Sequence, residues 1–195
     1  MLRLKYILFT TAIVFSTIIT FAQNTEFGKV TLQEVKDNIF ESDTTASAVI
    51  LYKNRHTYFN YEHPEGYILV TEIHKRIKIL NKDGLKYATE NIDLYRAGSS
   101  KERAGNIKGY TYNVEGGRLK KEKLKKNGIF KKTTSDHWSE TSFTLPNVKV
   151  GSVIEWTYKV TSPFIWLIDD LIIQEDIPTV HYFGKVRTLN FFHYN

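Results

Sequence analysis

The spacing of hydrophobic positions changes once along the chain, from a helical pattern to an alternating one. Near the start, Thr31 and Glu34 have the spacing of a capping box, in which each side chain satisfies a free amide of the first helical turn. The apolar residues that follow fall on one helical face: Leu32, Val35, Ile39 and Phe40. The pattern predicts a short helix over residues 31–41 whose apolar face is covered by another element.

From Ala46 onward, apolar and polar residues alternate, which predicts β-strands. The stretch "ASAVILYKN" contains few charges and predicts a central strand. In "YILVTEIHKRIKILN", the residues Ile73, Ile77 and Ile79 share one side. The polar residues predicted to face solvent on the other side are Glu72, His74, Arg76 and Lys78.

A tight turn is predicted at "NKDG", residues 81–84, where Gly84 can take a positive φ. The segment "LKYATENIDLY" then returns as a strand, so the two strands around this turn are predicted to form a β-hairpin. The segment "AGSSKERAG" predicts a loop, and "NIKGYTYNV" predicts a strand closed by "EGG" at 115–117.

The stretch "LPNVKVGSVIEWTYKVTSP" raises the question of whether it carries chemistry or only packing. After a turn at Pro146-Asn147 it alternates, and Glu155 is flanked by apolar residues, which makes it the position to examine for an unexpected partner. The side predicted to be buried holds Ile154, Trp156, Tyr158 and Val160. One helix followed by short strands at turn spacings predicts a mainly β fold, an antiparallel β-sandwich with one short N-terminal helix after a signal peptide.

The composition is that of one domain and excludes any chemistry that depends on cysteine. The 195 residues are 42% hydrophobic and 14% aromatic, which is enough for a sizeable core. The absence of cysteine removes disulfides, thiolate metal sites and cysteine nucleophiles.

Residues 1–22 have the three-part layout of a secretory signal peptide. Arg3 and Lys5 precede an apolar run, and the small residues Thr20 and Ala22 precede the expected cut before Gln23. Cleavage would lower the formal net charge from +6 to +4, because Arg3 and Lys5 leave. The sequence therefore predicts an exported protein, periplasmic or associated with the cell envelope, whose domain spans 23–195. The alternative is an uncleaved membrane anchor, which would then be the chain's contact with the membrane.

The segment 118–132 is strongly basic and carries Glu122 as its single acid. One hypothesis is a polyanion site for an acidic glycan or an anionic lipid headgroup; nucleic acid is not expected as a partner of an exported protein. The alternative is a solvated, lysine-bearing edge strand that resists aggregation. The candidate binding residues are Arg118, Lys120, Lys121, Lys123, Lys125 and Lys126, with Lys131 and Lys132 further along.

Other candidate chemistry is weaker. The acid pairs Asp169-Asp170 and Glu175-Asp176 suggest a glycosidase or a calcium site, or alternatively solvated charges or ion-pair partners of the basic segment. None of the six histidines has the spacing of a metal motif, and no nucleophile elbow or phosphate-binding glycine loop is present. The aromatic turn 58–67 allows carbohydrate stacking or turn packing. We therefore predict no enzymatic activity, no cofactor and no metal.

Several segments in order resemble one bacterial envelope family. They are "FGKVTLQEV", "ASAVILY", "RIKILNKDG", "IKGYTYNVEGG", "FTLPNVKVGSVIEWTYKVTSPF" and "QEDIP". Together they make the chain, from about Phe27 onward, similar to the Domain of Unknown Function 3857 family (DUF3857). The resemblance implies a mainly antiparallel β-sandwich that precedes a transglutaminase-like, papain-type domain holding the catalytic residues.

The resemblance leads us to expect the accessory domain without that enzyme. The expected role is a non-catalytic interaction or scaffold module, and the expected partner is a transglutaminase-like domain or an envelope polymer. The alternative is a binding module for an acidic glycan or an anionic lipid headgroup through the basic segment. The family's signature stretch, which ends in "VTSPF", is then a wall of the sandwich, with packing as its role.

Overall fold

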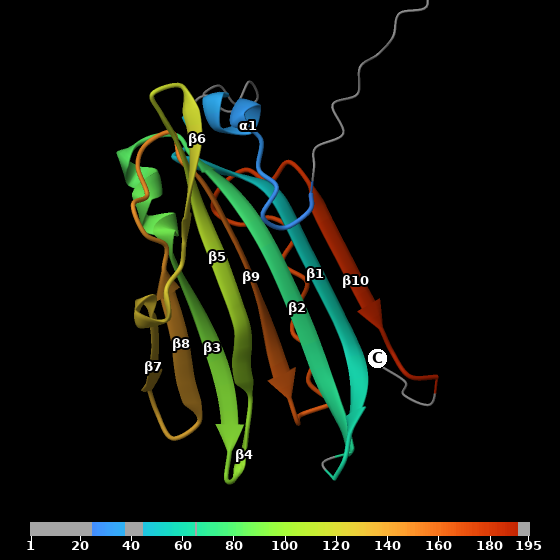
Figure 1. The fold of residues 1–195 in the computed structure, drawn as a ribbon. Helices are drawn as coiled ribbons and strands as arrows, with labels where there is room; N and C mark the ends of the chain where they lie inside the picture. The colour runs from blue at the N-terminus through green and yellow to red at the C-terminus, as the bar shows by residue number, and fades with distance from the viewer. Residues whose placement is uncertain (1–24, 38–44, 65, 191–195) are drawn as a thin grey trace, which may run out of the picture.

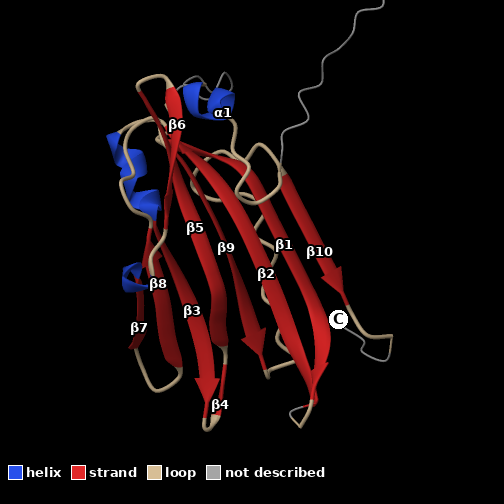
Figure 2. Ribbon diagram, in the orientation of Figure 1, coloured by secondary structure: helices blue, strands red, loops and turns tan. Residues whose placement is uncertain are grey.

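The computed structural model describes residues 25–37, 45–64 and 66–190 (Figure 1). Within these residues most of the chain is strand, and helix is limited to α1 (Leu32–Lys36) and the 3-10 turns η1 (Lys82–Ala88) and η2 (Lys126–Gly128) (Figure 2). Two sheets pack face to face, so the predicted mainly β sandwich with one short N-terminal helix is confirmed. The predicted signal peptide, residues 1–22, lies outside the described residues.

The larger sheet has six strands in the order β10-β1-β2-β9-β5-β6. All neighbours are antiparallel except β1 and β10, which run parallel with Lys53 opposite Tyr182. The predicted central strand is β1, which lies between β2 and β10. The bounds of the six strands are β1 Ala48–Glu62, β2 Gly66–Ile79, β5 Arg103–Glu115, β6 Arg118–Lys123, β9 Val153–Ser162 and β10 Tyr182–Arg187.

The smaller sheet has four strands in the order β4-β3-β8-β7 and covers part of one face of the larger sheet. The remainder of that face, along β1 and β2, lies against the segment between β9 and β10 rather than against a strand. The bounds of the four strands are β3 Thr89–Ala97, β4 Ser100–Lys101, β7 Ile129–Thr133 and β8 Trp138–Thr144.

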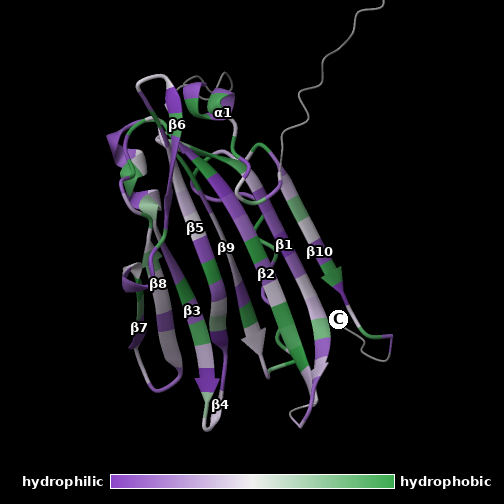
Figure 3. Cartoon of the chain, in the orientation of Figure 1, coloured by the Kyte–Doolittle hydropathy of each residue, from purple (hydrophilic) through white to green (hydrophobic). Residues whose placement is uncertain are grey.

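The main core lies between the two sheets. Ile154 and Trp156 of β9 meet Phe143 of β8, and the rings of Trp156 and Phe143 lie 6.0 Å apart edge to face. Hydrophobic and hydrophilic positions alternate along the strands (Figure 3), as the pleat of a sheet requires. The side of β9 predicted to be buried is therefore the core side, and this stretch is a wall of the sandwich.

A second, smaller core lies on the opposite face of the larger sheet, under α1 (Figure 1). The predicted capping box of Thr31 and Glu34 is formed, and α1 presents Val35 to the sheet beside Tyr112 and Val153. The observed helix ends at Lys36, and residues 38–44 lie outside the described part of the chain.

The prediction that the polar side of β2 faces solvent is wrong for most of its length. Arg76 is 0% exposed and Lys78 is 3% exposed, and only 14% of the His74 side chain is exposed. Glu72, midway along β2, does reach solvent. Periodicity detects an apolar face, but it does not detect an N-terminal segment that returns to cover a polar one.

The predicted hairpin around residues 81–84 is also wrong. β2 pairs with β1 and β9, whereas β3 pairs with β4 and β8, so η1 carries the chain from one sheet to the other. Gly84 lies inside η1 without a positive φ. Glycine is needed there because a Cβ would lie 2.2 Å from the carbonyl oxygen of Ser47, and this close approach joins η1 to the start of β1.

Two other turn predictions agree with the structure. Gly116 and Gly117 take positive φ between β5 and β6, and Asn147 takes a φ of 51° in the turn after Pro146. The segment predicted as a loop at 97–105 instead contains the short hairpin that joins β3 to β5 through β4. In the part of the chain that is described, no helix is both long and apolar enough to cross a membrane.

Candidate functional site

Glu155 is the centre of a buried polar cluster on the α1 side of the larger sheet. Its side chain is 0% exposed, and Arg76 of β2 donates to Glu155 Oε1 from Nε at 3.1 Å and from Nη2 at 2.7 Å. His74 Nε2 lies 2.8 Å from the same oxygen. The other oxygen accepts from the Tyr112 hydroxyl at 3.0 Å and from the amide of Gly28 at 2.8 Å.

The N-terminal segment closes over this cluster. Arg76 also binds Glu34 of α1 at 2.7 Å and the carbonyl oxygen of Glu26 at 3.1 Å, so one guanidinium joins the helix to the sheet. The ring of Phe27 packs between His74 and Tyr110, at 5.5 Å and 5.4 Å between ring centroids. The cluster is therefore covered by residues 26–34 rather than open to a ligand.

The partners of Glu155 keep its buried carboxylate ionised. Burial alone would raise the pKa of the Glu155 carboxyl, but the hydrogen bond from His74 and the charge and hydrogen bonds of Arg76 outweigh it and lower that pKa. The carboxylate is thus ionised and accepts at both oxygens, so His74 donates through Nε2. A buried carboxylate beside a histidine and a tyrosine could transfer protons, but here every close partner is held in a closed network. We infer that it stabilises the fold.

Lys78 adds a second buried cation on the same face. Its Nζ donates to the carbonyl oxygens of Val35 in α1 and Gly151 before β9, at 2.5 Å and 2.7 Å. Burial lowers the pKa of Lys78 to about 8. The charge of this lysine therefore reduces stability at neutral pH, and that cost disappears as the amine becomes neutral.

A pH prediction follows for Lys78. Between pH 8 and its ordinary pKa of 10.5, the unfolded chain binds the Lys78 proton more than the folded chain does, so the contribution of Lys78 to stability rises with pH. Urea unfolding is measured for the native chain and for Lys78→Met at pH 7.5 and pH 10. The free energy of unfolding of the native chain, relative to that of the variant, should be larger at pH 10 than at pH 7.5. Comparison with the variant removes the contribution of the tyrosines, and exposed Lys126→Met is the control. A difference that does not change with pH would contradict this.

The opposite face of the larger sheet holds a second polar cluster, centred on Glu175. Lys53 of β1 and Lys75 of β2 approach its carboxylate at 2.6 Å and 3.0 Å, and the side chains of both lysines are 8% exposed. Lys53 also donates to the carbonyl oxygen of Ile172. Burial would raise the pKa of Glu175, but the charge of Lys75 and the hydrogen bond from Lys53 lower it. These contacts fix the segment 163–181 against β1 and β2.

The predicted acid pairs do not converge on one site. Asp176 accepts from Tyr87 and Lys86 of η1, while the backbone carbonyls of Asp169 and Asp170 accept from Arg55 of β1. The suggestion that these acids pair with the basic segment is wrong, because their cations come from β1, β2 and η1. In the residues that the structure describes, no group of histidines and acids is placed to hold a metal ion.

The predicted polyanion residues lie on and just after β6, at one edge of the larger sheet, and the alternation of the strand divides them. Lys121 and Lys123 pair across with Tyr112 and Tyr110, whereas Arg118 and Lys120 point to the other face. Lys120 binds Glu115, and Lys121 lies 3.8 Å from the Tyr110 ring centroid and donates to the carbonyl oxygen of Gly28. Lys125 and Lys126 follow, exposed, at η2. The six residues therefore do not share one surface.

The aromatic residues of the turn 58–67 also lie in two different places. Tyr61 and Tyr67 face each other across the end of the β1–β2 hairpin with ring centroids 5.3 Å apart, and both are exposed. Tyr58 lies on the α1 side of the sheet and donates to Glu72.

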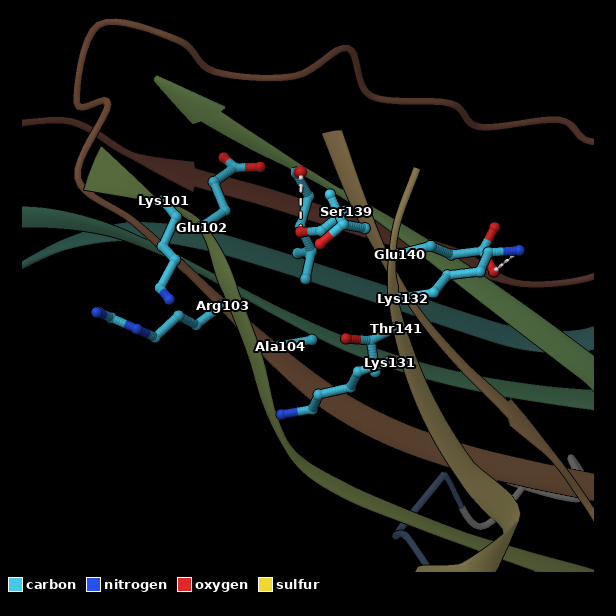
Figure 4. A pocket seen from close by; sticks show the side chains of 11 residues that line it. Lys101, Glu102, Arg103, Ala104, Lys131, Lys132, Ser139, Glu140 and Thr141 are labelled. Atoms are coloured by element: carbon cyan, nitrogen blue, oxygen red, sulfur yellow. Dashed lines mark hydrogen bonds and ion pairs between the residues drawn. The ribbon is translucent and has the colours of Figure 1, made fainter. Parts of the chain in front are cut away.

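The structure also contains a hollow between the two sheets that was not predicted from the sequence. It has a volume of about 390 Å³ and lies between β5 and the inner side of β7 and β8 (Figure 4). In that view, Ala104 points from β5 toward Thr141, whereas the side chains of Lys101 and Arg103 extend to the other side of β5. Lys132 and Glu140 pair with each other at 3.0 Å. Lys101 and Arg103 belong to the stretch interpreted as a loop, so their place among the lining residues could be found only from the fold.

Comparisons with known proteins show no family membership. No protein-family model matches the chain, and no curated protein sequence matches it. Among solved structures, it resembles a protein from Parabacteroides distasonis described as a candidate protease, at 13% identity and a TM-score of 0.47 over 60% of this chain. It also resembles two M1 zinc metallopeptidase structures, one from Deinococcus radiodurans and one with bound L-tryptophan, each at 15% identity over 66% of this chain, with TM-scores of 0.29 and 0.30. The chain spans 23% of the length of each of these proteins.

Proposed function

We propose that this chain is a non-catalytic, exported β-sandwich module that binds a protein partner through its C-terminal segment and β10. The observation that carries this proposal is the placement of exposed apolar side chains. Eight of the fourteen large hydrophobic residues exposed in the described part of the chain lie between positions 166 and 186. They are Trp166, Leu167, Leu171, Ile172, Ile173, Val180, Phe183 and Val186.

This concentration of apolar surface favours a protein contact. Trp166 is 68% exposed, Ile173 is 60% exposed and Phe183 is 60% exposed. Exposed apolar side chains that gather in one part of a protein surface mark an interaction site. Exposed aromatic and branched side chains of this kind are enriched in protein interfaces. The lower end of β10 is hydrophobic in Figure 3, next to the open edge of the larger sheet.

The apolar segment is held in a defined position. Glu175 joins it to Lys53 and Lys75, and Arg55 binds the carbonyl oxygens of Asp169 and Asp170. A partner would therefore meet an ordered surface and lose little conformational entropy in ordering it on binding. The resemblance to the DUF3857 family makes a transglutaminase-like domain our proposed partner.

The proposal is tested by titrating the purified chain with a purified bacterial transglutaminase-like domain and measuring binding by calorimetry. We expect binding, and we expect Ile172→Asp/Ile173→Asp to weaken it at least about tenfold, because two carboxylates enter an apolar contact. The matched control is Leu85→Asp, which changes an exposed leucine of η1. No binding to any such domain, equal binding by the double variant, or hydrolytic activity in the chain alone would contradict the proposal.

A second candidate is the binding of an acidic glycan or an anionic lipid headgroup through residues 118–126. The observation in its favour is that Arg118, Lys123, Lys125 and Lys126 are exposed at a sheet edge. The division of the lysines between two faces makes a single binding surface harder to form. Salt-dependent retention on heparin or anionic vesicles, lost on changing Lys120, Lys121, Lys123 and Lys125 to alanine, would support it.

A further inference from the structure

β10 is the outermost strand of the larger sheet, and one side of its backbone has no partner among the described strands (Figure 1). On its inner side it runs parallel to β1, and the amide of Lys53 donates to the carbonyl oxygen of His181 at 2.9 Å. Along a strand, alternate residues direct both their amide and their carbonyl oxygen to the same neighbour. Residues 183 and 185 therefore bind β1, and the backbone groups of Tyr182, Gly184 and Val186 point outward.

One face of this edge is apolar. Tyr182, Gly184 and Val186 share the core side of the sheet, because Tyr182 lies opposite Lys53, whose Nζ is 5.7 Å from the Tyr182 ring centroid. A Cβ at Gly184 would lie 2.7 Å from the Tyr182 ring, so this ring lies along the strand and covers the glycine. Lys53 also donates to the carbonyl oxygen of Ile172, so the apolar side of β10 continues into the apolar segment before it.

The other face of β10 is basic. Lys185 and Arg187 lie on the α1 side, because Arg187 pairs with Tyr58 and its guanidinium carbon lies 5.8 Å from that ring. Both cations are exposed, and neither forms an ion pair with an acid of the described chain. Glu72, an acid of β2 on the same side, is already paired with Lys159 at 2.8 Å. Two cations at an open strand edge are thus available to an acidic ligand.

An edge of this kind selects an amphipathic strand. Open backbone groups pair with another extended chain, whereas a lipid surface cannot satisfy them. A strand added beside β10 would direct its side chains alternately to the two faces, about 7 Å apart along each face. Its apolar side chains would then meet Tyr182 and Val186, and its acidic ones would meet Lys185 and Arg187. A second copy of β10 would place like charges together, which disfavours self-association through this edge.

We propose that the partner engages this chain by strand addition, in which an extended segment of alternating apolar and acidic residues pairs with the outer edge of β10. This inference rests on the proposed function and specifies how its partner is recognised. The backbone groups of three residues of β10 would form the hydrogen bonds: Tyr182, Gly184 and Val186. The sequence pattern of the bound segment would be the source of specificity.

The test is fluorescence anisotropy with a labelled eight-residue peptide in which glutamate and valine alternate. We expect saturable binding and a loss of at least about tenfold for Val186→Pro. Proline removes the outward amide of residue 186 but none of the amides that bind β1. The matched control is Val186→Ala, which keeps the amide and should lose much less. Circular dichroism checks that each variant folds.

The charges of the edge are tested with the same peptide. Binding should weaken with salt and fall at least about tenfold for Lys185→Glu, because a carboxylate would then face the acidic side chains. The charge-matched control, Lys126→Glu, changes an exposed lysine outside β10 and should bind nearly as the native chain does. An equal loss in Lys126→Glu and Lys185→Glu would contradict recognition at this edge.

Two methylated peptides test the backbone pairing. One carries methyl groups on the valine nitrogens and the other on the glutamate nitrogens. In either direction of pairing only one set of alternate amides faces β10, so one peptide should lose binding and the other should keep it. Equal binding of both peptides, or retention of the chain on anionic vesicles without binding of the unmodified peptide, would overturn the inference.

The inference and the proposed function can fail separately. If the transglutaminase-like domain binds and Ile172→Asp/Ile173→Asp weakens it, but Val186→Pro leaves it unchanged, the proposed function is supported and strand addition is wrong. If the peptide binds as expected but no such domain does, strand addition to β10 is supported and the proposed partner is wrong.

Discussion

Replacing Glu155 by alanine is expected to lower the free energy of unfolding by about 3–5 kcal/mol, because it leaves a buried guanidinium without its carboxylate. Arg76 is 0% exposed and would keep Glu34 and the carbonyl oxygen of Glu26 as partners, but lose the buried carboxylate. The amide of Gly28 and the Tyr112 hydroxyl would lose an acceptor in the same step. Urea unfolding followed by tryptophan fluorescence measures the loss.

Two comparison variants test whether the loss in Glu155→Ala comes from the burial of its charge network. The matched control is Glu115→Ala, which removes a carboxylate that pairs with Lys120 and Lys149 at the surface and should leave stability unchanged within error. Replacing both members, as Glu155→Leu with Arg76→Met, should cost less than Glu155→Ala, because no unpaired charge stays buried. Equal effects of Glu155→Ala and Glu115→Ala would show that the cluster does not secure the fold.

Replacing Trp156 by alanine is expected to have the second large effect and to lower the free energy of unfolding by about 3–5 kcal/mol. Trp156 is 1% exposed and packs against Phe143 of the other sheet, while the Nζ of Lys75 lies 5.6 Å from its ring centroid. Alanine would leave a cavity between the two sheets that the surrounding strands can fill only partly. The same urea titration, followed by circular dichroism since a tryptophan is lost, measures the change.

Trp156→Phe distinguishes packing from hydrogen bonding. The indole Nε1 is buried without a hydrogen-bond partner in the described structure, so phenylalanine loses volume but no hydrogen bond. We expect a loss of about 1 kcal/mol, well below that of alanine. If phenylalanine and alanine cost the same, the indole nitrogen would have a role that the structure does not show.

The alternation of residues in β9 was enough to predict its two sides. Trp156 and Ile154 face the core. Glu155, predicted as the position to examine because of its apolar neighbours, accepts from Gly28, His74, Arg76 and Tyr112. The signal was a single acid inside an apolar strand, which is costly unless the acid is paired. The identity of its partners was not predictable, because they come from residues 28, 74, 76 and 112.

The errors have a common physical cause. Arg76 and Lys78 were predicted to face solvent because charges usually do, yet the N-terminal segment supplies acceptors that allow them to be buried. The hairpin at 81–84 was predicted from local turn residues, but η1 carries the chain between sheets because β3 pairs with β8 instead. Local sequence specifies strands and turns well, whereas the choice of strand partner depends on contacts between distant residues.

The hollow between the two sheets could not be predicted for the same reason. Lys131 was seen as part of the basic segment, but Lys101 and Arg103 lie about thirty positions away in the sequence, in a stretch interpreted as a loop. Only the fold, in which β5 lies beside β7 and β8, makes residues from these distant stretches line one hollow (Figure 4).

The parallel pairing of β10 with β1 has a consequence for the order of folding events. Lys53 reaches its neighbour in β10 only after Tyr182 has been synthesised, so during biosynthesis β10 is the last described strand that can join the larger sheet. Until then the free margin of β1 is open to any other extended polypeptide nearby. Premature termination before residue 182 would leave that margin permanently uncovered, and a chaperone that shields it during biosynthesis would raise the yield of native protein.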